Sequence, residues 1–330
     1  MTKIVKISIF FLLVFCPLLS AQGVRYVISP LNAEPLLREE QLRATVDYLT
    51  DPATGGRAMG TEGGAKVAAW LSSAFLDLGL EPLNGAFQHG FTAGETFGRN
   101  VIGLIPGCAS VPRYVLVMAH YDNLGNLKDT FYPGADSNAS GVAALLELAR
   151  MMARMHALKR DYGASLLFVA LDGKEKDLAG ADALWRGIAA GQLLDPVTGK
   201  SVSAADISLV VNIDQLGAVL SPVTPGNPDY LLMLSRPAGS RRATLASVNK
   251  DRNIGLELAY DYYGSKDFTR LFYEQVSDQS IFLRQGIPAV MFTSGITLNN
   301  NKPWDDADSL DYAVLRKRVR LIFYFLDKML

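Results

Sequence analysis

The sequence is poor in cysteine and histidine. Its 330 residues include 2 cysteines and 3 histidines. Cys16 lies in an apolar N-terminal segment that we expect to be removed, which leaves Cys108 alone. A single cysteine excludes an internal disulfide and a cysteine-based zinc site. The stability of the folded protein must therefore come from a sizeable apolar core.

The sequence also lacks an excess of charge of either sign. It has 32 lysines and arginines against 33 aspartates and glutamates, a net charge of −1. Residues 1–21 hold two lysines and no acid, so the net charge changes from −1 to −3 without them. No basic stripe is present, and this argues against nucleic acid as a partner.

The apolar stretch within residues 1–21 predicts a secretory signal peptide. Two lysines precede a short apolar core at residues 9–15, and small residues offer a cleavage point before Gln22. The core is too short for a membrane anchor, and no later run reaches the roughly 20 residues that span a bilayer. We therefore expect an exported protein, periplasmic or secreted, without a transmembrane segment after signal removal.

Beyond this signal, apolar runs of strand length alternate with amphipathic helix patterns. We expect strands at residues 87–91, 100–107, 113–123, 165–171, 207–215, 256–262 and 287–292. We expect helices at 65–80, 142–155, 178–190, 240–252 and 313–328, a hairpin around 195–200 and a proline-rich surface loop at 221–229. This alternation predicts a single α/β domain over residues 22–330. Its three layers would be a mainly parallel mixed sheet with helices on both faces.

Polar side chains follow several expected strands at their carboxyl ends. A solvated turn is a sufficient explanation for any one of them. Four segments share the arrangement, and their polar residues are His120 and Asp122, Lys174 and Glu175, Asp214, and Asp278. Open α/β sheets hold their ligands at this edge. A histidine and several carboxylates together indicate a site for a hard or borderline metal cation.

The order of these motifs resembles the zinc-dependent exopeptidases of metallopeptidase family twenty-eight, which includes bacterial aminopeptidases and is close to the glutaminyl cyclases. The resemblance covers about residues 40–328. The motifs are AHYDN, PGADSNASGVAALLELA, LFVALDGKE, VNIDQLG, SDQSIFLRQGIPAVMF and NKPWDDADSLDY. The resemblance implies a zinc exopeptidase fold and removal of N-terminal residues from peptides.

The family's site holds two zinc ions that share a bridging aspartate, and a glutamate serves as the general base for the bound water. The resemblance carries several ligand positions onto this chain. His120 and Asp214 match ligands of the first ion, and Glu175 matches a ligand of the second. Asp122 matches the aspartate that supports the first histidine.

Three positions depart from the family pattern. Ser137 stands at the position of the bridging aspartate, with Asp136 immediately before it. Lys174 stands at the position of the general base, and Asn301 at that of the final histidine. A neutral hydroxyl is a poor zinc ligand, and a protonated amine cannot accept a proton. We expect zinc to be reduced to one ion or absent.

Two functional hypotheses follow. In the first, the protein is a catalytically impaired or non-catalytic relative that binds a peptide or protein in the cleft, and the Lys174 ammonium replaces a zinc ion and neutralises Glu175 and Asp214. In the second, it is an active exopeptidase with a one-metal site. The residues of that site are His120, Asp136, Glu175 and Asp214.

Two further features have alternative explanations. Serine hydrolase chemistry would need His89, His120 or His156, and the sequence has no G-x-S-x-G elbow. We expect His89 in a strand and His156 on a helix surface. An aromatic cluster either lines a substrate groove or packs in the core, and we favour the core. Its members are Tyr260, Tyr262, Tyr263, Phe268, Phe272 and Tyr273.

Overall fold

The structure is a computed structural model. It describes residues 28–160, 162–219, 224–262 and 264–330. The expected signal peptide, part of the proline-rich loop and Tyr263 lie outside these residues. Within them, no helix combines the length and the apolar character that crossing a bilayer requires.

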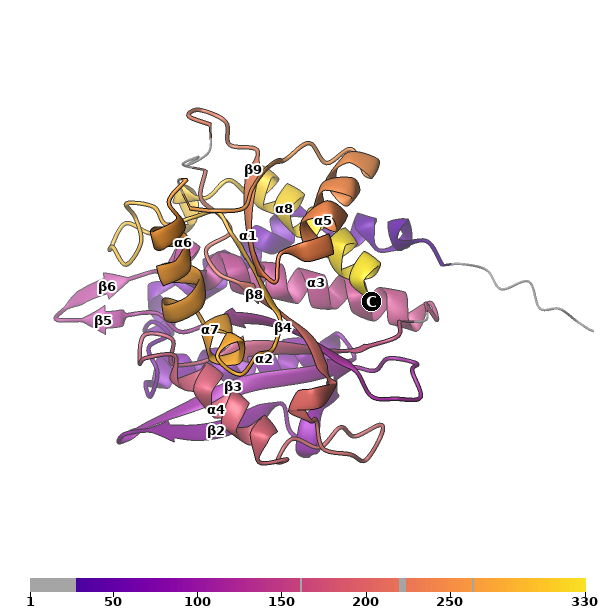
Figure 1. Ribbon diagram of the computed structural model, residues 1–330. Coiled ribbons are helices and arrows are strands. Elements are labelled where there is room, and N and C mark those ends of the chain that lie inside the picture. The colour runs from indigo at the N-terminus through magenta and orange to yellow at the C-terminus, as the bar shows by residue number, and fades with distance from the viewer. Residues whose placement is uncertain (1–27, 161, 220–223, 263) are drawn as a thin grey trace, which may run out of the picture.

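A nine-stranded mixed sheet forms the centre of the molecule (Figure 1). Its order is β1-β3-β7-β4-β8-β11-β9-β10, with β2 paired to β3. The central strands β7, β4, β8 and β11 run parallel, and antiparallel pairs flank them. The strands are β1 Glu81–Pro82, β2 Gln88–Ala93, β3 Thr96–Ile105, β4 Tyr114–His120, β7 Ser165–Leu171, β8 Ile207–Ile213, β9 Tyr230–Arg236, β10 Glu257–Ala259 and β11 Ala289–Thr293. A separate hairpin, β5 Gly125–Leu127 and β6 Thr130–Tyr132, projects from the body (Figure 1).

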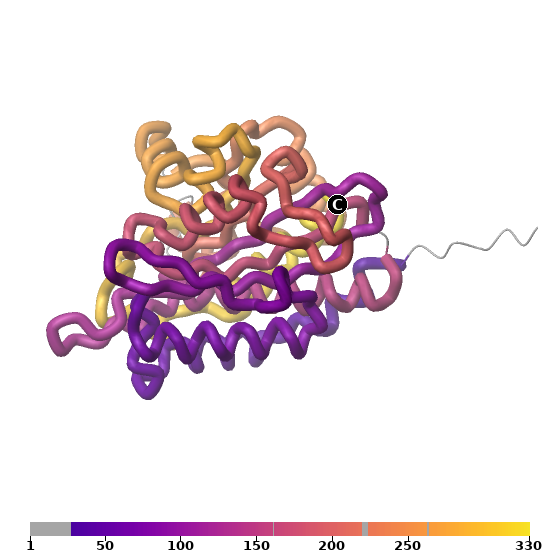
Figure 2. Tube along the Cα trace, turned by 90° about the horizontal axis from the view of Figure 1, so that it is seen from below, coloured from indigo at the N-terminus to yellow at the C-terminus, as the bar shows by residue number. Residues whose placement is uncertain are grey.

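Helices cover both faces of the sheet. The helices are α1 Glu39–Thr50, α2 Glu62–Asp77, α3 Ser140–Ala157, α4 Ala179–Ala189, α5 Gly239–Asp251, α6 Lys266–Leu271, α7 Gln279–Leu283 and α8 Tyr312–Met329. One apolar core joins the sheet to α1, α2, α3, α5 and α8. A second core joins the other face to α4 and α7. In Figure 2 the indigo N-terminal helices and the orange segments that include α6 lie on opposite sides of the molecule. The predicted α/β class with helices on both faces of a mixed sheet is confirmed.

Helix α2 illustrates how the sequence builds one of these layers. Thr61 caps its N-terminus, because its hydroxyl accepts a hydrogen bond from the amide of Gly64 at 3.1 Å. Val67, Leu71 and Phe75 recur every four residues and are fully buried. This apolar stripe fixes the face that α2 turns toward the sheet.

Most expected elements are present, with differences at short ones. The expected strand at 165–171 is β7 with unchanged bounds, and the helices at 178–190 and 240–252 are α4 and α5 within one residue. The expected hairpin at 195–200 is reduced to one antiparallel bridge between Leu194 and Ser201. Strand β9 and the short helices α6 and α7 were not predicted. Five or six helical residues are too few to show a helical period. Strand β9 begins with a continuous apolar run, YLLML, and this signal was overlooked.

Candidate active-site cleft

The cleft lies at the carboxyl ends of the parallel strands. A cavity of about 200 Å³ is lined by the residues that follow β7 and β8, by the segment before α3 and by the loop after β11. Its polar lining includes Ser137, Lys174, Glu175, Asp214 and Asn301. The structure therefore brings together five positions that were singled out from the sequence.

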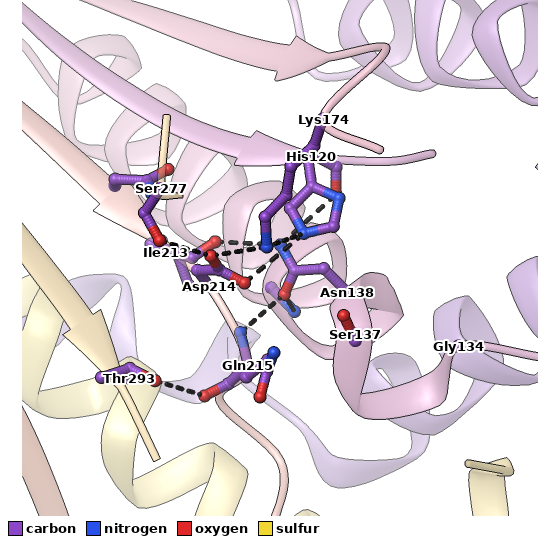
Figure 3. A network of polar contacts seen from close by, with 12 residues as sticks. His120, Gly134, Ser137, Asn138, Lys174, Ile213, Asp214, Gln215, Ser277 and Thr293 are labelled. Atoms are coloured by element: carbon purple, nitrogen blue, oxygen red, sulfur yellow. Dashed lines mark hydrogen bonds and ion pairs between the residues drawn. The ribbon is translucent and has the colours of Figure 1, made fainter. Parts of the chain in front are cut away.

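Lys174 reaches from the end of β7 across the end of β4 toward β8 (Figure 3). Its Nζ atom donates to Oδ2 of Asp214 at 2.8 Å and lies 3.1 Å from Nε2 of His120. Nε2 of His120 is itself 3.4 Å from Oδ1 of Asp214. The side chains of His120 and Asp214 are 0% and 3% exposed, and that of Lys174 is 13% exposed. The three side chains form one buried cluster.

Electrostatics favour the charged pair within this cluster. Burial lowers the pKa of Lys174, but the charges of Asp214 and Asp278 raise it above its ordinary value. Burial raises the pKa of Asp214, but the Lys174 ammonium and a hydrogen bond from His120 bring it well below its ordinary value. The protonated amine of Lys174 and the ionised carboxylate of Asp214 therefore form the charged pair of this cluster.

Two residues of the segment before α7 complete the surroundings of Asp214. The hydroxyl of Ser277 donates to Oδ2 of Asp214 at 3.0 Å. Asp278 is 1% exposed, and neither of its carboxylate oxygens has a hydrogen-bond partner among the described residues. Burial raises the pKa of Asp278 to about 6, although His120 and Lys174 oppose this. Ser277 was missed by sequence reasoning, since a serine before an aspartate carries no distinctive signal.

Asp122 fixes the backbone that follows β7. Its two carboxylate oxygens accept hydrogen bonds from the amides of Lys174 and Glu175 at 3.0 and 3.1 Å. Oδ1 of Asp122 also lies 3.5 Å from Nδ1 of His120. A fully buried carboxylate thus positions both the residue that ends β4 and the loop that presents Lys174.

Asp136 points away from the cluster. Its Oδ1 atom accepts from the amides of Gly217 and Ala218 at 2.8 and 3.2 Å, and Ser140 donates to the same atom. Burial and the nearby charge of Asp305 raise the pKa of Asp136 to about 7.

Ser137 is held through its backbone. Its amide donates to Oδ2 of Asp305 at 3.1 Å, and the amide of Asp136 donates to Oδ1 of the same carboxylate at 2.8 Å. Ser137 lines the cleft and is buried.

Glu175 and Asn301 lie at the open side of the cleft. Both residues are exposed and line the cavity. Among the described residues, no hydrogen bond joins the Glu175 carboxylate to Lys174. Glu175 acts on Lys174 only through its charge, which raises the lysine pKa after the larger effects named above.

Asn138 forms hydrogen bonds with the backbone at the end of β8, next to the cleft (Figure 3). Its amide nitrogen donates to the carbonyl of Ile213 at 3.0 Å, and its carbonyl oxygen accepts from the amides of Gln215 and Gly141. A Cβ atom at Gly141 would lie 2.3 Å from this oxygen, so the close approach requires glycine. Sequence reasoning missed Asn138, although its place within GADSNASG was a signal.

The residues present do not fit a zinc ion at the first position. Zinc lies about 2.0–2.2 Å from imidazole nitrogen and carboxylate oxygen. The Lys174 nitrogen already lies within hydrogen-bond distance of the two atoms that would hold the ion. A zinc ion and the Lys174 ammonium therefore cannot both lie between His120 and Asp214. At the second position, Ser137 and Asn301 offer a neutral hydroxyl and a neutral amide, which are weak zinc ligands.

Most of the aromatic cluster packs in a third apolar core, as favoured from the sequence. Tyr262 and Tyr273 are buried in it, and Phe268 and Phe272 pack against it. Tyr262 and Phe272, whose ring centroids are 5.6 Å apart, also border the cleft. Tyr260 and Tyr273 instead line a neighbouring groove.

The two remaining histidines lie outside the cleft. His89 lies in β2, as expected, and is half-buried, and its Nε2 atom has no hydrogen-bond partner among the described residues. His156 lies in the last turn of α3 and is half-buried rather than fully exposed. Neither contributes to the cluster at the strand ends.

Two curated proteins illustrate the sequence relationships of this chain. The uncharacterized protein YfbL of Escherichia coli K12 is 27% identical over 302 residues, which cover 86% of this chain and 85% of that protein. The BOS complex subunit ncln of Danio rerio is 37% identical over 137 residues. That match covers 38% of this chain and only 22% of the ncln chain.

Solved structures share the fold. The LapA aminopeptidase of Legionella pneumophila superposes with a TM-score of 0.69 at 17% identity, covering 94% of this chain and 78% of LapA. A glutaminyl cyclase of Porphyromonas gingivalis gives a TM-score of 0.65 at 17% identity, with 89% of this chain and 99% of the cyclase covered. The sequence profile of Peptidase family M28 matches residues 100–326. The resemblance seen in the motifs is thus confirmed, and the chain belongs to Peptidase family M28.

Proposed function

We propose that this protein is a peptidase-fold binding protein that does not hydrolyse peptide bonds, and that it holds a peptide or a segment of a protein in the cleft at the strand ends. In this proposal the Lys174 ammonium takes the place of the first metal ion.

The position of Lys174 Nζ carries the proposal. The nitrogen contacts both His120 and Asp214, the two side chains that match ligands of the first ion. A buried cation there neutralises the Asp214 carboxylate, a role that a zinc ion has in the family. A metal ion could bind only after the Lys174 side chain had moved away from this position. The displaced ammonium would then repel the ion from a short distance.

Lys174 also cannot act as the general base. A base must accept a proton from the attacking water near neutral pH. The raised pKa of Lys174, caused by Asp214 and Asp278 against the effect of burial, keeps its amine protonated. Without a second carboxylate beside Glu175, no group in this position activates water.

The walls of the cleft support binding of a polypeptide. Phe272 offers part of its ring, and Val276 is 42% exposed at the cavity. Leu298 lies in the loop that also lines the cavity and is 85% exposed. Exposed apolar side chains around a cavity are typical of a surface that a partner covers. The exposed Glu175 carboxylate adds an acceptor for donors of the ligand.

An active one-metal exopeptidase is the second candidate. One observation favours it, because Oδ2 of Asp136 is buried without a hydrogen-bond partner among the described residues. It requires two rearrangements, since Lys174 must leave Asp214 and the Asp136 carboxylate must turn from the amides of Gly217 and Ala218.

We also infer that the protein is exported, because residues 1–21 have the pattern of a signal peptide. Expression of the full chain with a C-terminal tag, followed by cell fractionation and N-terminal sequencing, tests this. A mature protein that begins at Gln22 supports export, and an intact N-terminus in the cytoplasm contradicts it.

Zinc content measured together with turnover of an aminoacyl-anilide tests the function itself. We expect substoichiometric zinc and no turnover above the buffer rate. Turnover that disappears in chelator and returns with added zinc would instead establish the one-metal enzyme.

A further inference from the structure

A second groove lies on the other side of helix α6 from the cleft. The wall between them is α6 with the π-helical turn Phe272–Val276 that follows it. Phe272 and Val276 face the cleft, whereas Arg270 and Tyr273 face the groove. The groove has a volume of about 410 Å³ and also receives residues from the end of β9 and from α5. It is distinct from the cleft and does not share lining residues with it.

The groove concentrates positive charge on a chain whose net charge is −1. Its charged lining residues are Arg236, Arg242, Lys266 and Arg270 with Asp261 and Glu274. Glu274 already forms an ion pair within the protein, because its Oε1 atom lies 2.5 Å from Nη1 of Arg236. Within the part of the chain that the structure describes, no ion pair joins Arg242, Lys266 or Arg270 to an acid. Three cations therefore remain available to a ligand.

The remaining surface of the groove fits an extended peptide segment better than a single ion. The guanidinium of Arg242 stacks over the Tyr260 ring, 4.7 Å from its centroid. The hydroxyl of the buried Tyr273, which also borders the groove, donates to the carbonyl of Ala289 at 2.7 Å and is therefore not available to a ligand. Helices α5 and α6 both supply cations along this open, partly aromatic groove. Such an arrangement fits several carboxylates spaced along an extended peptide segment.

We propose that this groove binds an acidic segment of a polypeptide through Arg242, Lys266 and Arg270. Guanidinium groups pair with carboxylates in a forked geometry, and exposed pairs of this kind depend strongly on ionic strength. This binding is independent of the chemistry of the cleft, because the two cavities share no lining residue in the described part of the chain.

Fluorescence anisotropy with two labelled octapeptides tests the proposal. One alternates glutamate and glycine, and the other has glutamine in place of each glutamate. Both are blocked at their termini so that neither presents a free amino group to the cleft. We expect the acidic peptide alone to bind at low salt, and its affinity to fall at least about 10-fold when the salt concentration is raised to about 0.3 M.

The double variant R242E/R270E and the single variant Lys266→Glu should each bind the acidic peptide more weakly, the double variant by about 10-fold or more. The matched control is Lys200→Glu, an exposed lysine outside the groove. Circular dichroism melting curves check that the variants fold. Equal binding of the glutamine peptide, or an equal loss in Lys200→Glu, would overturn the proposal. Binding of inorganic phosphate or of vesicles of anionic phospholipid, without binding of the acidic peptide, would overturn it as well.

Discussion

The Lys174 ammonium and the Asp214 carboxylate form a buried ion pair with an Nζ–Oδ2 distance of 2.8 Å. The pair joins the ends of β7 and β8, and His120 at the end of β4 lies against both. A side chain thus connects the ends of three neighbouring strands, and in our proposal its ammonium takes the place of a metal ion. This substitution has consequences for stability, for metal binding and for the cleft.

Replacing Lys174 by methionine should destabilise the protein strongly. The change keeps a side chain of similar length but leaves the buried Asp214 carboxylate without its cation. We expect the free energy of unfolding to fall by about 3 kcal/mol. Urea denaturation at pH 7 in the presence of chelator measures it.

Lys176→Met provides the matched control, because Lys176 is exposed in the same loop. It should change the free energy of unfolding by no more than about 0.5 kcal/mol. Equal stability of the Lys174→Met variant and the wild type would show that the ammonium is not the counter-ion of Asp214.

The stability of the wild type should fall as pH rises from about 4 to 8, in part because of Asp136. Burial and the charge of Asp305 raise its pKa to about 7 in the folded state. The folded protein then binds a proton that the unfolded chain, with an ordinary carboxyl pKa of about 3.9, has lost. This contribution is complete below the unfolded value and is lost as pH rises through about 7.

The variant Asp136→Asn should remove this dependence. Between pH 4 and 8 the wild type should lose about 2–4 kcal/mol more stability than the variant. Asp172 and Asp278, whose pKa values burial raises to about 7 and about 6, act in the same direction but remain in both proteins. Urea denaturation across this pH range measures the difference. Parallel pH profiles would mean that Asp136 is already ionised at low pH.

Asp122 should be needed to hold the loop that presents Lys174. Asparagine has one acceptor oxygen where Asp122 uses two, so one amide of the pair Lys174 and Glu175 loses its partner. We expect Asp122→Asn to lower the free energy of unfolding by about 2 kcal/mol. Hydrogen exchange at these two amides should accelerate.

The exposed Asp77 at the end of α2 serves as the control for this change. Asp77→Asn should leave both the stability and the exchange of the loop amides unaltered. If Asp122→Asn does the same, the two amides draw no stability from the carboxylate.

The triple variant with Ser137→Asp, Lys174→Glu and Asn301→His should regain zinc. It returns the bridging carboxylate, the general base and the final histidine to their positions in the cleft. We expect about two zinc ions per chain and a melting temperature that rises with added zinc. The single variant Lys174→Glu should bind less zinc, because the bridging ligand is still missing. A triple variant without zinc would indicate that the cleft has been remodelled beyond these three positions.

The parts of the fold that were predictable are those with a strong local pattern. Strand β7 is continuously apolar and ends at a turn, and α2 shows apolar residues every three or four positions. Helix α7 has only five residues and is stabilised by tertiary contacts, so its local sequence does not define it. Strand β9 has a continuous apolar run like that of β7 and could have been predicted from it.

The positions of Lys174, Glu175 and Asp214 could be predicted because each follows an expected strand at the same edge of the sheet. Ser137 and Asn301 were placed only by the resemblance to the family. The side-chain orientations could not be predicted. The direction of the Asp136 side chain is set by amides 81 and 82 residues away in the sequence, and the hydroxyl that contacts Asp214 comes from Ser277, 63 residues away. Whether Lys174 pairs with Asp214 or with Glu175 is likewise decided by packing across the strand ends.

In our proposal the Lys174 nitrogen takes the place of the first metal ion between His120 and Asp214. Crystals grown with excess zinc, with diffraction data collected on both sides of the zinc absorption edge, show which of the two occupies this position. We expect continuous density from Lys174 to the Asp214 carboxylate and no anomalous peak within coordination distance of His120. A zinc peak bound by His120 and Asp214, with the Lys174 side chain turned away, would contradict it.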